Sequence, residues 1–283
     1  MSNRLYRSGA ELLQEIEATC LPETAIAIWY LGQASMMIKF KSSFILFDPH
    51  LENSLSKRVQ NPCTRNYPSP LDPALLDFVD YIFLTHTHAD HLEPATILKI
   101  AACNSKVKYI IPAPEEGVLQ ELGIDTSKII GAKAGTEIKL NGLTCIPIPA
   151  AHYQIRRDAA GNTFELGYAI KMGRVTIYHS GDTIVYPELP ETLNNIGIDI
   201  AMLPINGRDW IREGKGIIGN TGFKEAADLC DAIAADLLIP MHFDLYEHNT
   251  ENPGYLVDYL YKRYPGMKYH IFQPGERFIY LKD

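Results

Sequence analysis

The chain has 283 residues, of which 46% are hydrophobic and 21% charged, a balance that excludes disordered and fibrous proteins. Its 34 acidic and 26 basic residues give a formal charge of −8, the wrong sign for binding a nucleic-acid backbone. No apolar run reaches the roughly eighteen residues of a membrane span, the amino terminus is charged, and the five cysteines are scattered without a CxxC pair. We therefore expect a cytoplasmic protein without disulfides and without nucleic-acid or membrane partners.

The first third of the chain predicts one helix followed by three strands. Leu12 and Ile16 recur at helical spacing within residues 9–19, and Ser8 is placed to cap this helix. The next apolar runs are rich in β-branched and aromatic residues and predict antiparallel strands at 25–31, 36–40 and 44–47. The segment 61–73 contains four prolines, which lack backbone donors, so we expect an ordered irregular loop there.

Strands and helices alternate through the rest of the chain. Further strands are expected at 81–85, 108–111, 143–148, 166–172, 175–178, 200–203, 237–239 and 268–272. Further helices are expected at 94–101, 114–122, 223–235 and 253–263, with Thr221 and Asn252 capping the last two. Because no repeat or long linker interrupts this pattern, we predict one α/β domain over residues 1–283, with 1–24 as a leading helical segment.

The most informative stretch is the run HTHADH at residues 86–91, which follows a predicted strand. Alternate side chains share one face of an extended segment, so His86, His88 and Asp90 are expected to converge on one point. His91 lies where the chain turns toward the next helix, and it is placed to serve a second centre beside the first. The alternative is a polar loop of solvated histidines, which this spacing makes much the weaker interpretation.

Three more potential metal ligands follow hydrophobic runs directly, namely His152, Asp182 and His242. Strand ends fix the separation of ligands better than flexible loops do, which favours a rigid site with two metal ions. Each histidine taken singly is more often an ordinary hydrogen-bonded residue. The combination with the HTHADH run is what predicts the metal centre.

These motifs resemble the metallo-β-lactamase superfamily, in which HxHxDH is followed by a later His, an Asp and a final His. The similarity is closer to the L-ascorbate 6-phosphate lactonase (UlaG-like) branch and extends from residue 25 to about residue 250. It rests on segments 29–34, 48–49, 149–152, 178–183, 203–209 and 239–242. The resemblance implies a metallo-β-lactamase αβ/βα four-layer sandwich, in which two mixed sheets are flanked by helices.

The resemblance also implies a ligand set for two divalent ions. One ion would be held by His86, His88 and His152, and the other by Asp90, His91 and His242, with Asp182 bridging both. Imidazole and carboxylate ligands without thiolates are compatible with zinc, manganese or iron. The lactonase branch favours Mn²⁺ and the wider superfamily favours Zn²⁺. We therefore expect either two Mn²⁺ ions or two Zn²⁺ ions per chain.

The charge of two such ions predicts the chemistry. A water shared by two dications loses a proton near neutral pH, and the bridging hydroxide then attacks the carbonyl carbon of an ester or lactone. Asp90 and Asp182 are the predicted catalytic carboxylates, and Asp90 is also placed to handle the proton of the leaving group. We therefore predict a metal-dependent hydrolase of a small anionic ester or lactone, such as a phosphorylated sugar lactone. Self-association into a homo-oligomer is implied by the resemblance alone.

Four further side chains have predicted roles around the metals. The superfamily position that matches Asp48 is an aspartate that supports the metal ligands, with a simple Asp-Pro turn as an equal alternative. His179 is expected to brace the loop that carries the bridging carboxylate, or to contact the pocket. The segment 206–222 is rich in glycine and cations, which favours a pocket wall over a plain surface loop, with Asn206 and Arg208 binding the substrate anion.

Other activities are known on the scaffold that the motif implies. Phosphodiester hydrolysis, as in RNA-processing nucleases that share HxHxDH, is the main alternative, but the acidic charge balance opposes it. Diiron oxidoreductases of this scaffold usually carry glutamate at the position of His88, which this chain lacks. A catalytically silent binding scaffold is disfavoured because every expected ligand is present.

Overall fold

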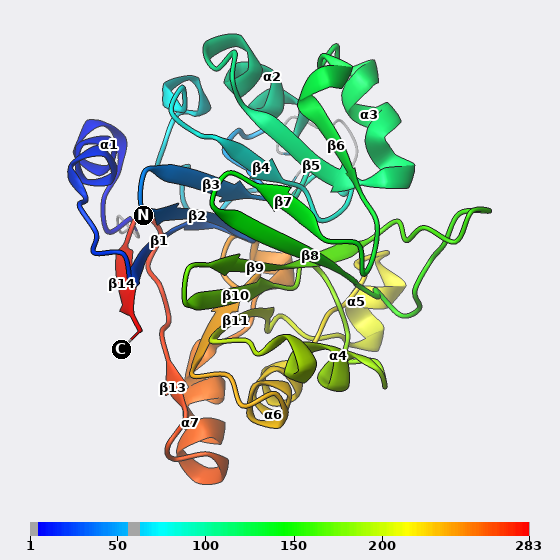
Figure 1. Ribbon diagram of the computed structural model, residues 1–283. Helices are drawn as coiled ribbons and strands as arrows, with labels where there is room; N and C mark the ends of the chain where they lie inside the picture. Colours follow the sequence, from blue (N-terminus) through cyan, green and yellow to red (C-terminus); the bar gives the residue numbers. More distant parts are fainter. Residues whose placement is uncertain (1–4, 56–62, 283) are drawn as a thin grey trace. The chain divides into compact units, whose positions relative to one another are not determined.

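The computed structural model describes residues 5–55 and 63–282, which group into two compact units. The first unit consists of the described residues up to Ala132 and those from Phe272 onward, and the second unit is Lys133–Ile271. Each unit contains one seven-stranded mixed sheet with helices against it (Figure 1). The predicted α/β class with two mixed sheets flanked by helices is confirmed, whereas the single domain stays a prediction.

The first sheet joins an antiparallel half to a parallel half, in the order β14-β1-β2-β3-β4-β5-β6. Its strands are β1 (Ala25–Gly32), β2 (Ser35–Phe40), β3 (Ser43–Phe47), β4 (Tyr81–Phe83), β5 (Lys108–Pro112), β6 (Ile129–Ala132) and β14 (Arg277–Leu281). The strands from β14 to β3 pair antiparallel, as the short turns between β1, β2 and β3 predict, and β3 to β6 pair parallel. The helical segments of this unit are α1 (Gly9–Ala18), α2 (Pro94–Cys103), α3 (Glu116–Glu121), η2 (Pro73–Leu75), η3 (Ala113–Glu115) and η4 (Thr126–Lys128).

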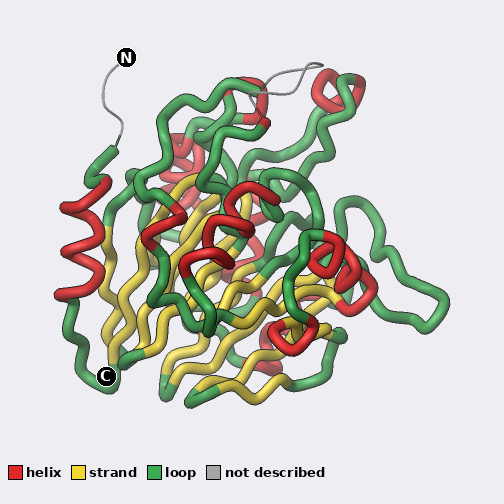
Figure 2. Tube along the Cα trace, turned by 90° about the horizontal axis from the view of Figure 1, so that it is seen from above, coloured by secondary structure: helices red, strands yellow, loops and turns green. Residues whose placement is uncertain are grey.

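Apolar side chains of α1, α2 and α3 pack with the first sheet in one hydrophobic core. Ile16 of α1, Ile97 of α2 and Leu119 of α3 are fully buried there with Trp29 and Ile82 of the strands. Figures 1 and 2 both show α1 beside the β14 edge of this sheet. Helical spacing in the sequence therefore marks the faces that the helices bury.

The second sheet has the order β13-β12-β11-β10-β9-β8-β7, again with an antiparallel and a parallel half. Its strands are β7 (Ile138–Leu140), β8 (Leu143–Pro149), β9 (Leu166–Met172), β10 (Val175–His179), β11 (Ile200–Pro204), β12 (Leu237–Met241) and β13 (Lys268–Tyr269). The helical segments of this unit are α4 (Leu189–Ile196), α5 (Trp210–Gly214), α6 (Phe223–Ala232), α7 (Pro253–Arg263) and η5 (Glu247–Asn249). Buried residues of α4, α6 and α7 form the core of this unit with β10, β11 and β12.

Strand direction decides where the side chains that follow each strand can meet. In the second unit β8 and β10 are both antiparallel to β9, and β10, β11 and β12 run parallel. In the first unit β1 and β3 are both antiparallel to β2, and β4 runs parallel to β3. The residues directly after these strands therefore lie along one edge of their own sheet, where ligands of parallel strands commonly gather.

The residues that cap the helices agree only in part with the caps predicted from the sequence. Asn252 caps α7 as predicted, because its side-chain oxygen accepts a hydrogen bond from the backbone two residues on at 2.9 Å. Ser8 precedes α1, but its side chain makes no capping hydrogen bond. Thr221 does not cap α6, since its hydroxyl donates to the carbonyl of residue 204. The cap is instead formed by Gly222, whose N–H donates to the Glu225 carboxylate at 3.0 Å.

Several elements lie outside the predicted list or differ from it. The sequence pattern missed β6, β7, β14, α4 and α5, and the strand predicted at 268–272 is only the two-residue β13. Residues 63–72 are irregular as predicted, residues 61 and 62 lie outside the described residues, and residue 73 begins η2. Among the described residues, no helix has the length and hydropathy needed to cross a bilayer.

Candidate metal centre

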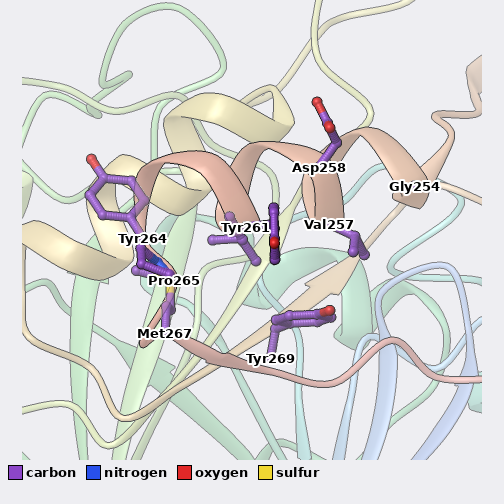
Figure 3. A pocket seen from close by; sticks show the side chains of 9 residues that line it. Gly254, Val257, Asp258, Tyr261, Tyr264, Pro265, Met267 and Tyr269 are labelled. Carbon is purple, nitrogen blue, oxygen red and sulfur yellow. The ribbon is translucent and has the colours of Figure 1, made fainter.

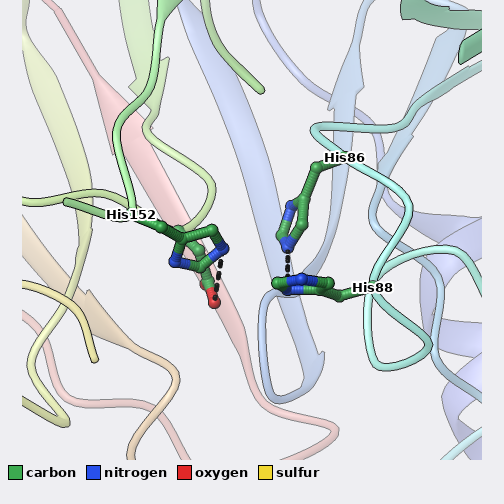
Figure 4. Close-up of side chains that lie close together, drawn as sticks. His86, His88 and His152 are labelled. Carbon is green, nitrogen blue, oxygen red and sulfur yellow. Dashed lines mark hydrogen bonds and ion pairs between the residues drawn. The ribbon is translucent and has the colours of Figure 1, made fainter. Parts of the chain in front are cut away.

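The histidine-rich loop leaves the end of β4 and is extended only as far as His88. There the ring nitrogens His86 Nε2 and His88 Nδ1 lie 2.9 Å apart (Figure 4). The His88 carbonyl then accepts hydrogen bonds from the N–H groups of His91 and Leu92, which closes a turn. The predicted extended face therefore does not continue to Asp90, because this turn places its carboxylate beside His91, with Oδ2 3.9 Å from Nε2.

Asp48 lies directly after β3, fully buried, and its carboxylate organises the histidine-rich loop. It accepts hydrogen bonds from the Thr85 N–H at 2.8 Å, the Thr85 hydroxyl at 2.7 Å and His91 Nδ1 at 2.8 Å. A proton on His91 Nδ1 leaves the lone pair on Nε2, which is the nitrogen able to bind a metal ion. A simple Asp-Pro turn does not require these hydrogen bonds to Thr85 and His91. They agree with the supporting role that the resemblance implies.

Thr85 is an orienting residue that the sequence reasoning missed. Its hydroxyl donates to Asp48 and lies 3.0 Å from His86 Nδ1, so it accepts a hydrogen bond from that nitrogen. The proton on His86 Nδ1 leaves the lone pair on Nε2, which faces His88. The position of a hydroxyl residue directly before the first histidine is the only sequence signal for this role.

Asp182 lies after β10 in the second unit, with an imidazole on each side of its buried carboxylate. The Oδ2 atom is 3.9 Å from His152 Nε2, an ion pair that the dashed line at His152 marks in Figure 4, and Oδ1 is 3.3 Å from His242 Nε2. The three residues follow β8, β10 and β12, whose ends share one edge of the sheet. One carboxylate that faces two imidazoles with different oxygens has the arrangement of a bridging ligand.

His179 ends β10 and is fully buried behind the loop that carries the Asp182 carboxylate. Its Nδ1 accepts a hydrogen bond from the Gly181 N–H at 3.3 Å, which favours bracing of that loop over contact with a substrate. The same loop is tied to the segment before His152, because Ala151 N–H donates to the Thr183 hydroxyl at 3.1 Å. The ligand loops of the second unit are thus held in place by hydrogen bonds from backbone N–H groups to side chains.

The two predicted substrate residues lie in the segment 206–222 but differ in their partners. Asn206 is fully buried, accepts from Asn220 Nδ2 at 3.2 Å and donates to Asn249 Oδ1 at 2.9 Å. Arg208 binds the Glu225 carboxylate through two hydrogen bonds of 2.8 and 2.7 Å. Its guanidinium therefore stabilises the start of α6 and is already neutralised.

Tyr153, the residue after His152, joins the segment 206–222 to the ligand loop. Its hydroxyl donates to Glu213 Oε1 at 2.9 Å and accepts from the Gly219 N–H at 3.1 Å. These two hydrogen bonds hold the segment to the residue that follows His152 within the second unit, and its role as a pocket wall stays a prediction.

Backbone strain gathers at the same residues. Five non-glycine residues of the described chain have positive φ angles, and they are Gln33, Lys41, Asp48, Ala234 and His242. Three of the five are candidate ligands or contact one, since Gln33 Nε2 donates to Asp90 Oδ2 at 2.8 Å. Such conformations cost about 1–3 kcal/mol each and cluster at functional sites, where the surroundings enforce them.

The donor atoms fit divalent metal ions in each unit by itself. Ligand atoms lie within 4.8 Å of each other in the pairs His86 with His88, Asp90 with His91, and His152 with Asp182. These imidazole nitrogens and carboxylate oxygens form a borderline-to-hard donor set that zinc, manganese and iron accept. The hydrogen bonds that fix the ring protons of His86 and His91 are what metal-binding histidines require.

A separate pocket of about 420 Å³ lies between α7 and β13 in the second unit (Figure 3). Figure 3 shows the rings of Tyr261 and Tyr269 facing this space, with Met267 below α7. None of the predicted site residues lines it. The pocket is therefore not part of the candidate metal centre.

Comparison with known proteins decides the family. A sequence model of the β-lactamase superfamily domain matches residues 44–243. The chain belongs to the metallo-β-lactamase superfamily. This superfamily member is 30% identical over 263 residues to a UPF0173 metal-dependent hydrolase of Thermococcus onnurineus, which covers 89% of the chain and 98% of that protein. It therefore belongs to a family of metal-dependent hydrolases.

Two solved structures share the fold of this chain. Igni18, a metallo hydrolase from Ignicoccus hospitalis, superposes with a TM-score of 0.68 at 21% identity, covering 92% of this chain and 100% of that chain. The isothiocyanate hydrolase from Delia radicum gut bacteria superposes with a TM-score of 0.71 at 17% identity, covering 90% and 99%. At these identities the likeness concerns the fold alone, and it confirms the fold that the motifs predict.

Proposed function

We propose that this superfamily member is a cytoplasmic binuclear metal-dependent hydrolase that opens an ester or lactone bond in a small anionic substrate. The observation that carries the proposal is Asp182, whose two oxygens face His152 and His242. In the proposed centre, His86, His88 and His152 would hold one ion and Asp90, His91 and His242 the other, with Asp182 as the shared ligand. L-ascorbate 6-phosphate lactonase is the model for the substrate class, because the motif segments resemble that branch.

Bound divalent ions supply Lewis acidity toward a carbonyl oxygen and lower the pKa of water. The residues of the chain prepare the ligands for this task, since Asp48 and Thr85 keep the protons of His91 and His86 on Nδ1, so that Nε2 of each ring would be the nitrogen that holds an ion. Asp90 is the carboxylate proposed to hold the proton that the leaving alkoxide needs. Its side chain is 23% exposed, so solvent reaches this carboxylate, whereas the side chain of His91 beside it is fully buried.

The wall formed by the segment 206–222 is proposed to bind the substrate. Asn206 lies two residues after β11, at the sheet edge that also carries Asp182, and is proposed to shape this wall, since its buried amide is already bonded to Asn220 and Asn249. Arg208 contributes less to binding an anion, since Glu225 already holds its guanidinium. A small substrate is favoured over a nucleic acid by the net charge of −8. Self-association is part of the same proposal, and light scattering of the purified protein checks it.

The test is a hydrolysis screen of protein loaded with Mn²⁺ or Zn²⁺. The substrates are phosphorylated sugar lactones, unphosphorylated lactones, simple esters and bis(p-nitrophenyl) phosphate. We expect turnover of a lactone or ester, its loss on treatment with a chelator, and its recovery on adding the metal back. Rapid turnover of the phosphodiester with inert lactones and esters would contradict the proposal and favour the nuclease-type alternative.

A further inference from the structure

Gln33 occupies the turn between β1 and β2 and reaches the histidine-rich loop 57 positions further along the chain. Its side chain is buried, with 1% of the residue exposed, and its Nε2 donates to Asp90 Oδ2 at 2.8 Å. The two residues come together because β1 ends at the same sheet edge as β4. The contact therefore follows from the topology of the first sheet.

The backbone holds Gln33 in a conformation that a glutamine avoids by itself. Its φ angle is +59°, in the left-handed region, and its carbonyl accepts a hydrogen bond from the Tyr30 hydroxyl at 3.3 Å. A Cβ at the preceding Gly32 would lie 3.1 Å from the Tyr67 ring, so only glycine fits there without displacing that ring. The same turn is tied to the Asp48 segment, because the Ser35 hydroxyl donates to the Asp48 carbonyl at 2.7 Å.

Asp90 needs such a partner more than the other ligands of the first unit. It lies in a turn rather than after a strand, and its side chain is 23% exposed, whereas the His91 side chain is fully buried. The Gln33 amide holds Oδ2, which is also the oxygen that lies 3.9 Å from His91 Nε2. Fixing that atom sets how the carboxylate faces the ring nitrogen of His91 that is able to bind a metal ion.

We propose that Gln33 is a positioning residue that orients the Asp90 carboxylate for metal binding. This inference rests on the proposed metal centre. The amide suits the task because it donates a hydrogen bond without a charge, so the carboxylate keeps its full negative charge for the ion. A lysine or arginine at this position would form an ion pair that competes with the metal. Asp90 and His91 are then each oriented by a residue that follows another strand, namely Gln33 after β1 and Asp48 after β3.

The test measures metal affinity directly, without relying on turnover. Apo protein is titrated with Zn²⁺ in competition with a chromophoric chelator, for the wild type and for Gln33→Met, which conserves side-chain length and removes the donor. Gln33→Asn is the second variant, because asparagine tolerates the left-handed backbone but is one methylene too short to reach Asp90. We expect one of the two binding steps to weaken by about 10-fold to 100-fold in both variants, with the other step unchanged.

The control variant is Asn104→Ala, which removes a different buried amide of the first unit. Asn104 donates to the carbonyls of Leu76 and Val79 at 3.1 and 2.7 Å, away from the ligand loop. It is expected to lower the melting temperature without changing either zinc affinity, which separates loss of stability from loss of positioning. Zinc affinities of the Gln33 variants that equal the wild type would overturn this inference and leave the proposed function standing. A wild type that binds neither Zn²⁺ nor Mn²⁺ would overturn both.

Discussion

At the scale of single residues, the environment of a side chain decides its chemistry more than its type does. Thr85 and Asp48 fix the ring protons of His86 and His91, so two chemically identical imidazoles present defined nitrogens. Asp182 differs from the exposed aspartates of the chain because it is 4% exposed between two imidazoles. The position of each side chain in the fold thus decides whether it can act as a metal ligand.

The cysteines give a prediction of the same kind. Burial is the main reason that the pKa of the Cys230 thiol rises to about 12, so roughly one thiol in ten thousand is ionised at pH 8. Cys20 is exposed. Because the thiolate is the reactive form, iodoacetamide at pH 8 is expected to label Cys20 of the folded protein and to leave Cys230 unmodified. The labelling rate of Cys230 is expected to rise as the pH approaches the raised pKa of its thiol.

Peptide mass spectrometry after timed labelling measures this difference, and labelling in denaturant serves as the control in which both thiols react. Equal labelling rates for the two cysteines in the folded protein at pH 8 would contradict the burial of Cys230 in the core of the second unit.

The sequence predicts the metal-binding residue types but not their supporting partners. His86, His88 and His91 are recognisable because three imidazoles and a carboxylate occur within six residues. Gln33 and Thr85 carry no such pattern. Gln33 lies 57 positions before its partner, and only the order of β1, β2, β3 and β4 brings it there. The sequence also leaves open whether Asp48 only belongs to a turn or orients the metal ligands. Its hydrogen bonds with Thr85 and His91 favour the orienting role.

At the scale of elements, helix starts show that a favourable residue type is not yet a cap. Ser8 and Asn252 both precede helices and both belong to the preferred capping types. Both residues have the extended backbone of an N-cap, but only the Asn252 side chain accepts a hydrogen bond from the first turn of its helix. Thr221 does not cap α6, since its hydroxyl donates to the carbonyl of Pro204, the last residue of β11.

Asn252, which caps its helix, and Ser8, which does not, form a matched pair for a stability measurement. Asn252→Ala is expected to lower the free energy of unfolding by about 1 kcal/mol, because the backbone N–H of Gly254 loses its partner. Ser8→Ala is expected to change it by less than about 0.5 kcal/mol. Urea unfolding followed by circular dichroism measures both, and a larger loss for Ser8→Ala than for Asn252→Ala would contradict the assigned caps.

The predicted elements are those with strong periodicity and deep burial, such as β9 and α7, whose bounds agree with the prediction at both ends. The missed strands are short or lie at sheet edges. In β7 no residue is fully buried, so its side chains lack the alternation that marks a half-buried strand. Helix α5 has only five residues, too few for a helical period to appear in the sequence.

At the scale of the molecule, the two units repeat one plan. Each sheet has an antiparallel half and a parallel half, and its candidate ligands follow strand ends, β4 alone in the first unit and β8, β10 and β12 in the second. No repeat is visible in the sequence, although the two sheets share this arrangement. The return of β14 to pair with β1, which places Ala25 opposite Leu281, is equally invisible to local patterns. The resemblance of the motifs, and not periodicity, predicted the fold family.

The most direct test of the account is the number of metal ions bound per chain. Purified protein is equilibrated with Zn²⁺ or Mn²⁺, freed of loosely bound metal and analysed by elemental mass spectrometry, beside the variants His88→Ala and Asp182→Ala. We predict about two ions per wild-type chain and fewer in both variants, with circular dichroism spectra that show an intact fold. A wild-type chain that retains no metal ion, or that hydrolyses its substrate at full rate after the metal is stripped, would contradict the central claim.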